Sequence, residues 1–139
     1  GNPEKILSDV EKQIHRRILL QTKTLILTPR YLVELSDDIC AIIPLPEVLW
    51  IYDHAAMRRT IKGRQLSYTI HVVTMKGEEY TLTGKSHREV SAIYHELNTR
   101  YPNFFFGYSK EHQEMVQYVL HEMKNEKHKK SVYKMNQRT

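Results

Sequence analysis

The strongest local concentration of charge in the sequence is a short basic segment. Arg58, Arg59, Lys62 and Arg64 lie close together, and no acidic residue occurs between Ala55 and Lys76. Clustered arginine and lysine side chains attract phosphate groups, nucleic acid or an anionic lipid surface. The segment 55–64 is predicted to be a loop, so its four cations form either an anion-binding or partner-binding surface, or an ordinary solvated loop.

A second basic region is the C-terminal tail, where Tyr133 stands among cations as aromatic residues do in binders of single-stranded nucleic acid. From Glu122 onward the basic residues are Lys124, Lys127, Lys129, Lys130, Lys134 and Arg138, against two glutamates. No known nucleic-acid-binding module is visible in the sequence. A frayed, solvated terminus is the alternative interpretation.

Residue types that could support catalysis are present but not suitably combined. The carboxylate pairs Asp37-Asp38 and Glu78-Glu79 lie in predicted turns, where neighbouring side chains point apart. Asp53 and His54 would take opposite faces of a strand, and no nucleophile can be assigned to them. We therefore predict a protein that is not an enzyme and that uses no cofactor.

The eight histidines do not predict a metal site. The stretches that begin at His95 (HELNT) and His121 (HEMKN) start like the H-E-x-x-H zinc motif but lack its second histidine. The single cysteine, Cys40, lies in the apolar run ICAII, which indicates a buried thiol and excludes an intramolecular disulfide. We expect scattered surface histidines and no bound metal.

The bulk properties indicate one ordinary folded domain. The chain has 139 residues, of which 27% are charged, and its formal net charge is +5. These values exclude a disordered or fibrous protein and mildly favour an acidic partner. No signal peptide or membrane-spanning segment is visible. The start Gly1-Asn2-Pro3 resembles a protease-trimmed end, so a membrane anchor upstream of Gly1 stays an open alternative.

Apolar periodicity predicts a helix, then strands, then helices. Helices are expected at 3–18, after the capping box Ser86-x-x-Glu89, and after Ser109. Six strands are expected, in the segments TLILT, YLVELS, ICAII, IPLPEVLWIYDH, LSYTIHV and YTLTG. The predicted domain spans 1–125, and 126–139 is predicted to be a basic flexible tail.

The fourth of these segments, Ile43–His54, holds the only tryptophan of the chain. As a strand it would place Val48, Trp50 and Tyr52 on one face and Leu49 and Ile51 on the other. A strand that is apolar on both faces is buried on both. We therefore expect one face to meet the sheet interior and the other to lie under an added helix, most plausibly the N-terminal one.

The order of these segments resembles bacterial PH-like families of unknown function, whose members are often attached to membrane segments. The resemblance covers roughly Thr22 to Ser109 and rests on TLILTPRYLVEL, AIIPLPEVLWIYDH, YTIHVVTMKGEEYTLTG and YPNFFFGYS. It implies an α+β fold with a bent antiparallel sheet or partly open barrel of about six or seven strands. An N-terminal helix and two C-terminal helices would flank it.

The resemblance does not extend to phosphoinositide binding, because the first hairpin connection, Pro29-Arg30, is too short to enclose an inositol phosphate. We predict a non-enzymatic interaction module that binds a protein partner or an anionic membrane surface through the basic segment 55–64. The alternative is a nucleic-acid-binding protein that uses its tail. We expect a cytoplasmic protein, either free or membrane-associated through a further segment, and a dimer stays open.

Overall fold

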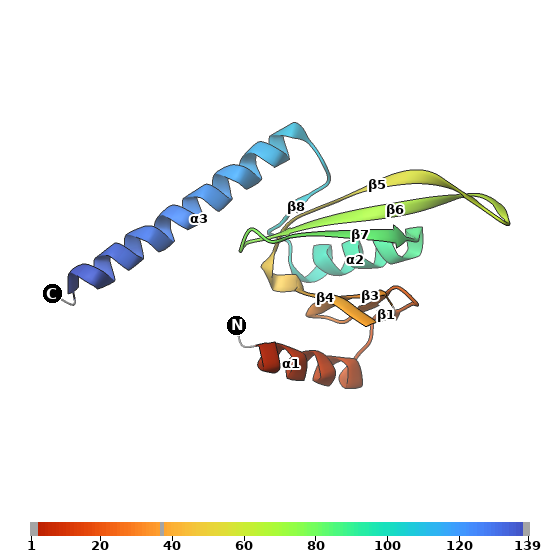
Figure 1. Cartoon of the computed structure of the whole chain (residues 1–139), viewed down its shortest axis with the longest axis horizontal. Helices are drawn as coiled ribbons and strands as arrows, with labels where there is room; N and C mark the ends of the chain where they lie inside the picture. Colours follow the sequence, from red (N-terminus) through yellow and green to blue (C-terminus); the bar gives the residue numbers. More distant parts are fainter. Residues whose placement is uncertain (1–2, 37, 138–139) are drawn as a thin grey trace.

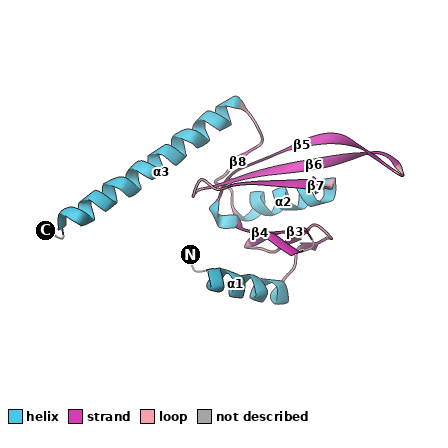
Figure 2. Cartoon of the chain, viewed as in Figure 1, coloured by secondary structure: helices cyan, strands magenta, loops and turns pink. Residues whose placement is uncertain are grey.

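The structure, a computed structural model, describes residues 3–36 and 38–137. For residues 13–15, 36, 38–40 and 128–137 it describes the backbone alone. Within this part of the chain, eight strands form two four-stranded sheets, accompanied by three α-helices and one short 3-10 helix (Figures 1 and 2). The side chain of Cys40 lies outside the described residues, and so does the buried thiol predicted for it.

The first sheet is antiparallel and has the strand order β1-β2-β3-β4. Its strands are β1 (Leu20–Gln21), β2 (Leu25–Leu27), β3 (Tyr31–Ser36) and β4 (Asp38–Pro44). Helix α1 (Pro3–Arg16) packs on one face, where its Val10 contacts Tyr31 and Val33. The Tyr31 hydroxyl also donates a hydrogen bond to an Asp9 carboxylate oxygen at 3.2 Å. One face of this sheet is therefore covered by the N-terminal helix.

The second sheet has the order β7-β6-β5-β8 and follows the 3-10 helix η1 (Leu45–Glu47). Its strands are β5 (Val48–Thr60), β6 (Gly63–Thr74), β7 (Glu79–Lys85) and β8 (Phe105–Phe106). The first three pair antiparallel, and β8 runs parallel to β5. Helix α2 (His87–Arg100) lies between β7 and β8 along the chain, and α3 (Lys110–Gln137) ends it.

The main hydrophobic core unites both sheets with α2. Leu25 and Ile43 from the first sheet, Ile51 and Ile70 from the second, and Ile93 from α2 are all fully buried in it. The second sheet also packs against α3 on its other face, through Leu49, Trp50, Val73 and Val116. Each sheet is thus covered by the shared core on one face and by a terminal helix on the other.

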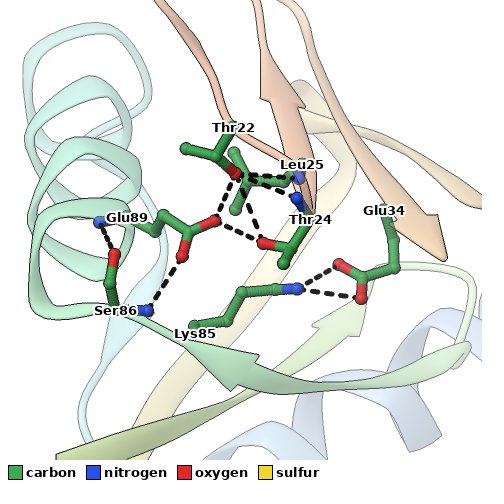
Figure 3. A network of polar contacts seen from close by, with 7 residues as sticks. All are labelled: Thr22, Thr24, Leu25, Glu34, Lys85, Ser86 and Glu89. Atoms are coloured by element: carbon green, nitrogen blue, oxygen red, sulfur yellow. Dashed lines mark hydrogen bonds and ion pairs between the residues drawn. The ribbon is translucent and has the colours of Figure 1, made fainter. Parts of the chain in front are cut away.

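The start of α2 is fixed by the capping box that the sequence predicts. The Ser86 side chain accepts a hydrogen bond from the backbone N–H of Glu89, and the Glu89 carboxylate accepts one from the backbone N–H of Ser86. The hydroxyls of Thr22 and Thr24 also donate to Glu89 (Figure 3). Burial opposes ionisation of Glu89, but these hydrogen bonds outweigh it and lower its pKa below the ordinary value.

A buried ion pair lies beside this network and joins the two sheets. The ammonium group of Lys85, at the end of β7, is 2.9 Å and 2.8 Å from the two carboxylate oxygens of Glu34 on β3 (Figure 3). The Lys85 side chain is 1% exposed and the Glu34 side chain 15%. Because both charged groups are largely removed from water, the loss of either one would leave the other buried without a counter-charge.

The α+β fold and all six predicted strands are confirmed, but the predicted count of six or seven strands is too low. The two further strands, β1 and β8, have two residues each, too few to show a sequence period. Where the resemblance implies one bent sheet or a partly open barrel, the described chain has two separate sheets and no closed barrel. The 3-10 helix containing Pro46 separates β4 from β5 and prevents one continuous sheet.

The start of β5, residues 48–51, is buried on both faces, as predicted, but its side chains are distributed differently. A register shift between Val48 and Trp50 marks a β-bulge. Leu49 and Trp50 therefore both contact the α3 side, whereas Val48 and Ile51 belong to the main core. The helix that covers Trp50 is α3, not the N-terminal helix that the sequence analysis favoured.

The C-terminal part of the chain has more helix than expected. Helix α3 continues to Gln137, so the backbone is helical where a flexible tail is predicted for 126–139. The side chains of Lys129, Lys130 and Lys134 lie outside the described residues, and so does Arg138. None of the helices in the described ranges combines the length and the apolar character needed to cross a bilayer.

The ion pair between the sheets leads to a stability prediction. We expect Lys85→Ala to lower the free energy of unfolding by about 3 kcal/mol, because it leaves the Glu34 carboxylate buried without its counter-charge. Replacing both partners, as in Lys85→Met with Glu34→Leu, should cost clearly less than the single change. Urea denaturation of the three proteins tests this, and a double variant less stable than Lys85→Ala would contradict it.

Candidate functional site

The basic segment lies at the end of a long β-hairpin made by β5 and β6. Pairing between these strands continues to Thr60 and Gly63, whereas β7 ends at Lys85, which pairs with Tyr68. Beyond that point the hairpin continues as a two-stranded ribbon past β7 and α2 (Figure 1). We refer to residues 56–67 as the hairpin tip. The prediction of a loop at 55–64 is therefore wrong, because most of this segment is paired strand.

The structure brings all four predicted cations together at the hairpin tip. Arg59 pairs directly with Arg64, Arg58 pairs with Gln65, and Lys62 lies in the turn. All four are exposed, and none takes part in the ion pairs found among the described side chains. Like charges directly opposite one another destabilise a strand pair. The tip therefore carries positive charge that the domain itself does not neutralise.

Large apolar side chains are exposed at the same tip. Met57 and Leu66 lie opposite one another and are 62% and 53% exposed, and Ile61 in the turn is fully exposed at 108%. Met57 and Leu66 continue the face of the sheet that holds Ile51 and Ile70, which the core buries. The core face of the second sheet thus extends beyond the elements that cover it.

The turn of the hairpin has a defined geometry. Gly63 has a backbone φ of +113°, a conformation that residues with a Cβ rarely adopt. The Thr60 hydroxyl donates a hydrogen bond to the Gly63 carbonyl oxygen at 2.8 Å. These features close the turn tightly, and the apolar Ile61 and the cationic Lys62 are held at its outermost point.

A concave region of about 240 Å³ lies between the hairpin tip and the polar network at the start of α2. Its lining includes Arg58, Gln65 and Ser67 of the tip, together with Lys85 and Ser86. Lys85 and Glu89 are already engaged with Glu34, Thr22 and Thr24. We assign this network a structural role.

The outer face of β5 and β6 carries a row of stacked rings. Trp50 and Tyr52 have ring centroids 4.4 Å apart, Tyr52 and His71 4.6 Å, and His71 and His54 5.1 Å. His71 Nε2 lies 3.2 Å from His54 Nδ1, so one ring donates a hydrogen bond to the other. Burial, and then the neighbouring His54, lowers the pKa of His71 below its ordinary value. Both causes favour the neutral form of His71.

Asp53 and His54 lie on opposite faces of β5, as the sequence analysis predicts. Asp53 accepts a hydrogen bond from the Tyr94 hydroxyl of α2, whereas His54 pairs with His71 on the outer face. No group of three or more histidine, cysteine, aspartate or glutamate residues that could hold a metal ion occurs in the part of the chain that the structure describes.

Comparison with family models gives one match. Residues 7–116 match the model of a domain of unknown function, DUF6709. The chain belongs to this family. The matched region of the DUF6709 domain runs from α1 into the first turns of α3 and includes both sheets and the whole β5–β6 hairpin. No curated protein and no solved structure matches the chain.

The sequence analysis identified the cations of the hairpin tip but missed its apolar residues. The exposure of Met57 and Leu66 depends on where α2 and β7 end, which the sequence does not indicate. Ile61 alone gives no signal in the sequence, because single apolar residues are common on protein surfaces; it gains meaning from its place in the same tip as the exposed Met57 and Leu66.

The stacked histidines give a prediction that NMR can test. We expect the pKa of His71 to lie below its ordinary value of 6.5, because burial and His54 both oppose protonation. In His54→Ala the pKa of His71 should rise, since the change removes a repelling charge and admits water. His95→Ala, an exposed position on α2, is the control and should leave it unchanged. A wild-type value at or above 6.5 would contradict the assignment.

Proposed function

We propose that this DUF6709 domain is a non-enzymatic interaction module that docks on an anionic membrane surface through the tip of its β5–β6 hairpin. The observation that carries the proposal is the coincidence of two features at one protruding point. Four cations that form no ion pair with a described side chain, Arg58, Arg59, Lys62 and Arg64, lie at the same tip as three exposed apolar side chains, those of Met57, Ile61 and Leu66.

An anionic bilayer stabilises both kinds of side chain at once. Each arginine or lysine near such a surface contributes about 1 kcal/mol, so four together contribute about 4 kcal/mol. Transferring the Ile61 side chain from water into the headgroup region contributes about 2 kcal/mol more. Nucleic acid would favour the cations alone, and the outermost part of the hairpin has no aromatic ring on which bases could stack.

We further propose that the domain is PH-like and bacterial, as the sequence resemblance implies. Two sheets, whose strands pair antiparallel except for the short β8, share one core with α2 and support the architectural part. The membrane contact would not enclose an inositol phosphate, because the connection from β2 to β3 is a short turn closed by its own hydrogen bonds. The Thr28 N–H donates a hydrogen bond to the Tyr31 carbonyl oxygen there, and the Thr28 hydroxyl accepts one from the Tyr31 N–H.

Sedimentation with lipid vesicles tests the proposal. We expect binding to vesicles that contain phosphatidylserine, weaker binding at high salt, and little binding to phosphatidylcholine vesicles. Changing Arg58, Arg59, Lys62 and Arg64 to Gln should weaken binding by about three orders of magnitude at low salt. Ile61→Asp alone should weaken it about tenfold or more, because it places a carboxylate at the point of contact.

A matched control separates the hairpin from the overall charge. Lys5, Lys12, Arg17 and Lys23 are exposed and lie outside the hairpin, and their change to Gln removes the same number of charges. This control should lower affinity less than about tenfold, because exposed charges far from the contact are screened. Equal losses in the two quadruple variants, or binding that ignores phosphatidylserine, would contradict the proposal.

The nucleic-acid alternative depends on the C-terminal segment rather than on the hairpin. Lys124 and Lys127 are exposed on α3 and are basic side chains of this segment that the structure describes. Titration with a single-stranded oligonucleotide, before and after deletion of the residues beyond Lys124, distinguishes the two functions. Oligonucleotide binding that the deletion abolishes, without any vesicle binding, would favour the alternative.

A further inference from the structure

A second concave site lies on the outer face of the second sheet, away from the hairpin tip. It has a volume of about 150 Å³ and lies where the first turns of α3 meet β5, β6 and β7. The residues of its lining that could recognise a ligand are Trp50, Tyr52, Glu79, Tyr108, Gln113 and Gln117. Neither the family match nor the proposed membrane contact assigns a role to this cavity.

Three aromatic rings form a continuous wall of the cavity. The centroid of the Tyr108 ring lies 6.0 Å from that of Trp50 and 5.4 Å from that of Tyr52, and Trp50 and Tyr52 are 4.4 Å apart. The three rings are drawn from β5 and from the segment between β8 and α3. Tyr108 is 62% exposed, so the wall is accessible from solvent.

Hydrogen bonds hold this wall in position. The indole N–H of Trp50 donates to the Gly107 carbonyl oxygen at 2.9 Å, and the Gly107 N–H donates to the Ile51 carbonyl oxygen at 2.8 Å. The Tyr108 hydroxyl donates to the side-chain oxygen of Gln113 at 3.3 Å. Binding a ligand would therefore need little reordering of the rings.

The charge of the cavity is opposite to that of the protein. The chain has a formal net charge of +5, yet the lining contains one charged side chain, the carboxylate of Glu79, and no cation. The field of Glu79 reaches the rings, since burial and then Glu79 raise the pKa of Tyr52. Aromatic faces attract cations, and the carboxylate adds to that attraction.

We propose that this cavity binds a quaternary ammonium group. Such a cation has methyl groups that lie against aromatic faces, and it needs no hydrogen-bond acceptor for each of its substituents. The aromatic wall supplies the contact surface and Glu79 the counter-charge. The proposal does not rest on membrane docking by the hairpin, which lies at the other end of β5.

Choline is the probe, and Trp50 reports its binding, because the single indole N–H gives one resolved NMR signal. We expect a saturable shift of that signal with choline. Neohexanol, the uncharged isostere of choline, should bind about tenfold more weakly, because it lacks the charge. Equal affinity for choline and neohexanol, or the absence of a saturable shift with choline, overturns the proposal.

Variants locate the site. Glu79→Gln should weaken choline binding at least about threefold, whereas Glu78→Gln, the same charge change at the adjacent residue outside the lining, should leave it unchanged. Tyr108→Leu should weaken binding about tenfold, with Tyr118→Leu, an exposed tyrosine of α3 outside the lining, as control. Equal effects of target and control overturn the proposal, and an intact NMR spectrum verifies folding.

A last comparison identifies the source of the group. A stronger response to phosphatidylcholine vesicles than to free choline, at equal headgroup concentration, assigns the site to a lipid headgroup. An equal or weaker response assigns it to a free solute. Both results agree with a quaternary ammonium site, and the absence of a saturable response to free choline overturns it.

Discussion

The buried polar network at the junction of the two sheets is the interaction on which the rest of the domain depends. Lys85 joins the end of β7 to Glu34 of β3, and the adjacent Glu89 joins the start of α2 to Thr22 and Thr24. An apolar core holds sheets together without fixing their mutual orientation closely, whereas these buried charges leave few alternatives. The network marks the point where β7 stops. In the described chain, the hairpin residues beyond the pairing of Tyr68 with Lys85 have no third strand beside them.

A protruding hairpin of this composition is costly for an isolated domain. Arg59 faces Arg64 across the strands, and Met57 and Leu66 keep most of their surface in water. Neither arrangement stabilises the folded chain, and both would be relieved by contact with a surface that is anionic and apolar at once. The second sheet thus has two distinct ends. At one end α3 covers Trp50 and leaves a small acidic cavity lined by aromatic rings, and at the other a basic tip is exposed. Their opposite charges suit different ligands.

Local patterns predicted much of the fold, and tertiary arrangement accounts for what they missed. The alternation from Leu66 to Val72 and the capping box at Ser86 and Glu89 were sufficient to predict β6 and the start of α2. The side of the molecule on which α3 packs was not predictable, because the β-bulge at Leu49 has no sequence signature here. The basic residues of the tip were identified from charge alone. Their extended hairpin geometry was not, since it depends on where β7 ends and on the partner that Lys85 finds in a distant strand.

The central claim is that the hairpin tip enters an anionic bilayer, and the depth of residue 61 tests it most directly. In an Ile61→Trp variant, tryptophan emission can be measured with vesicles that carry brominated acyl chains, which quench fluorophores at membrane depth. Trp50 is only 6% exposed, so the wild-type protein supplies the background signal. The account predicts that the added tryptophan is quenched by brominated vesicles containing phosphatidylserine and much less by brominated phosphatidylcholine alone. Vesicle-bound protein whose residue 61 stays unquenched would contradict it.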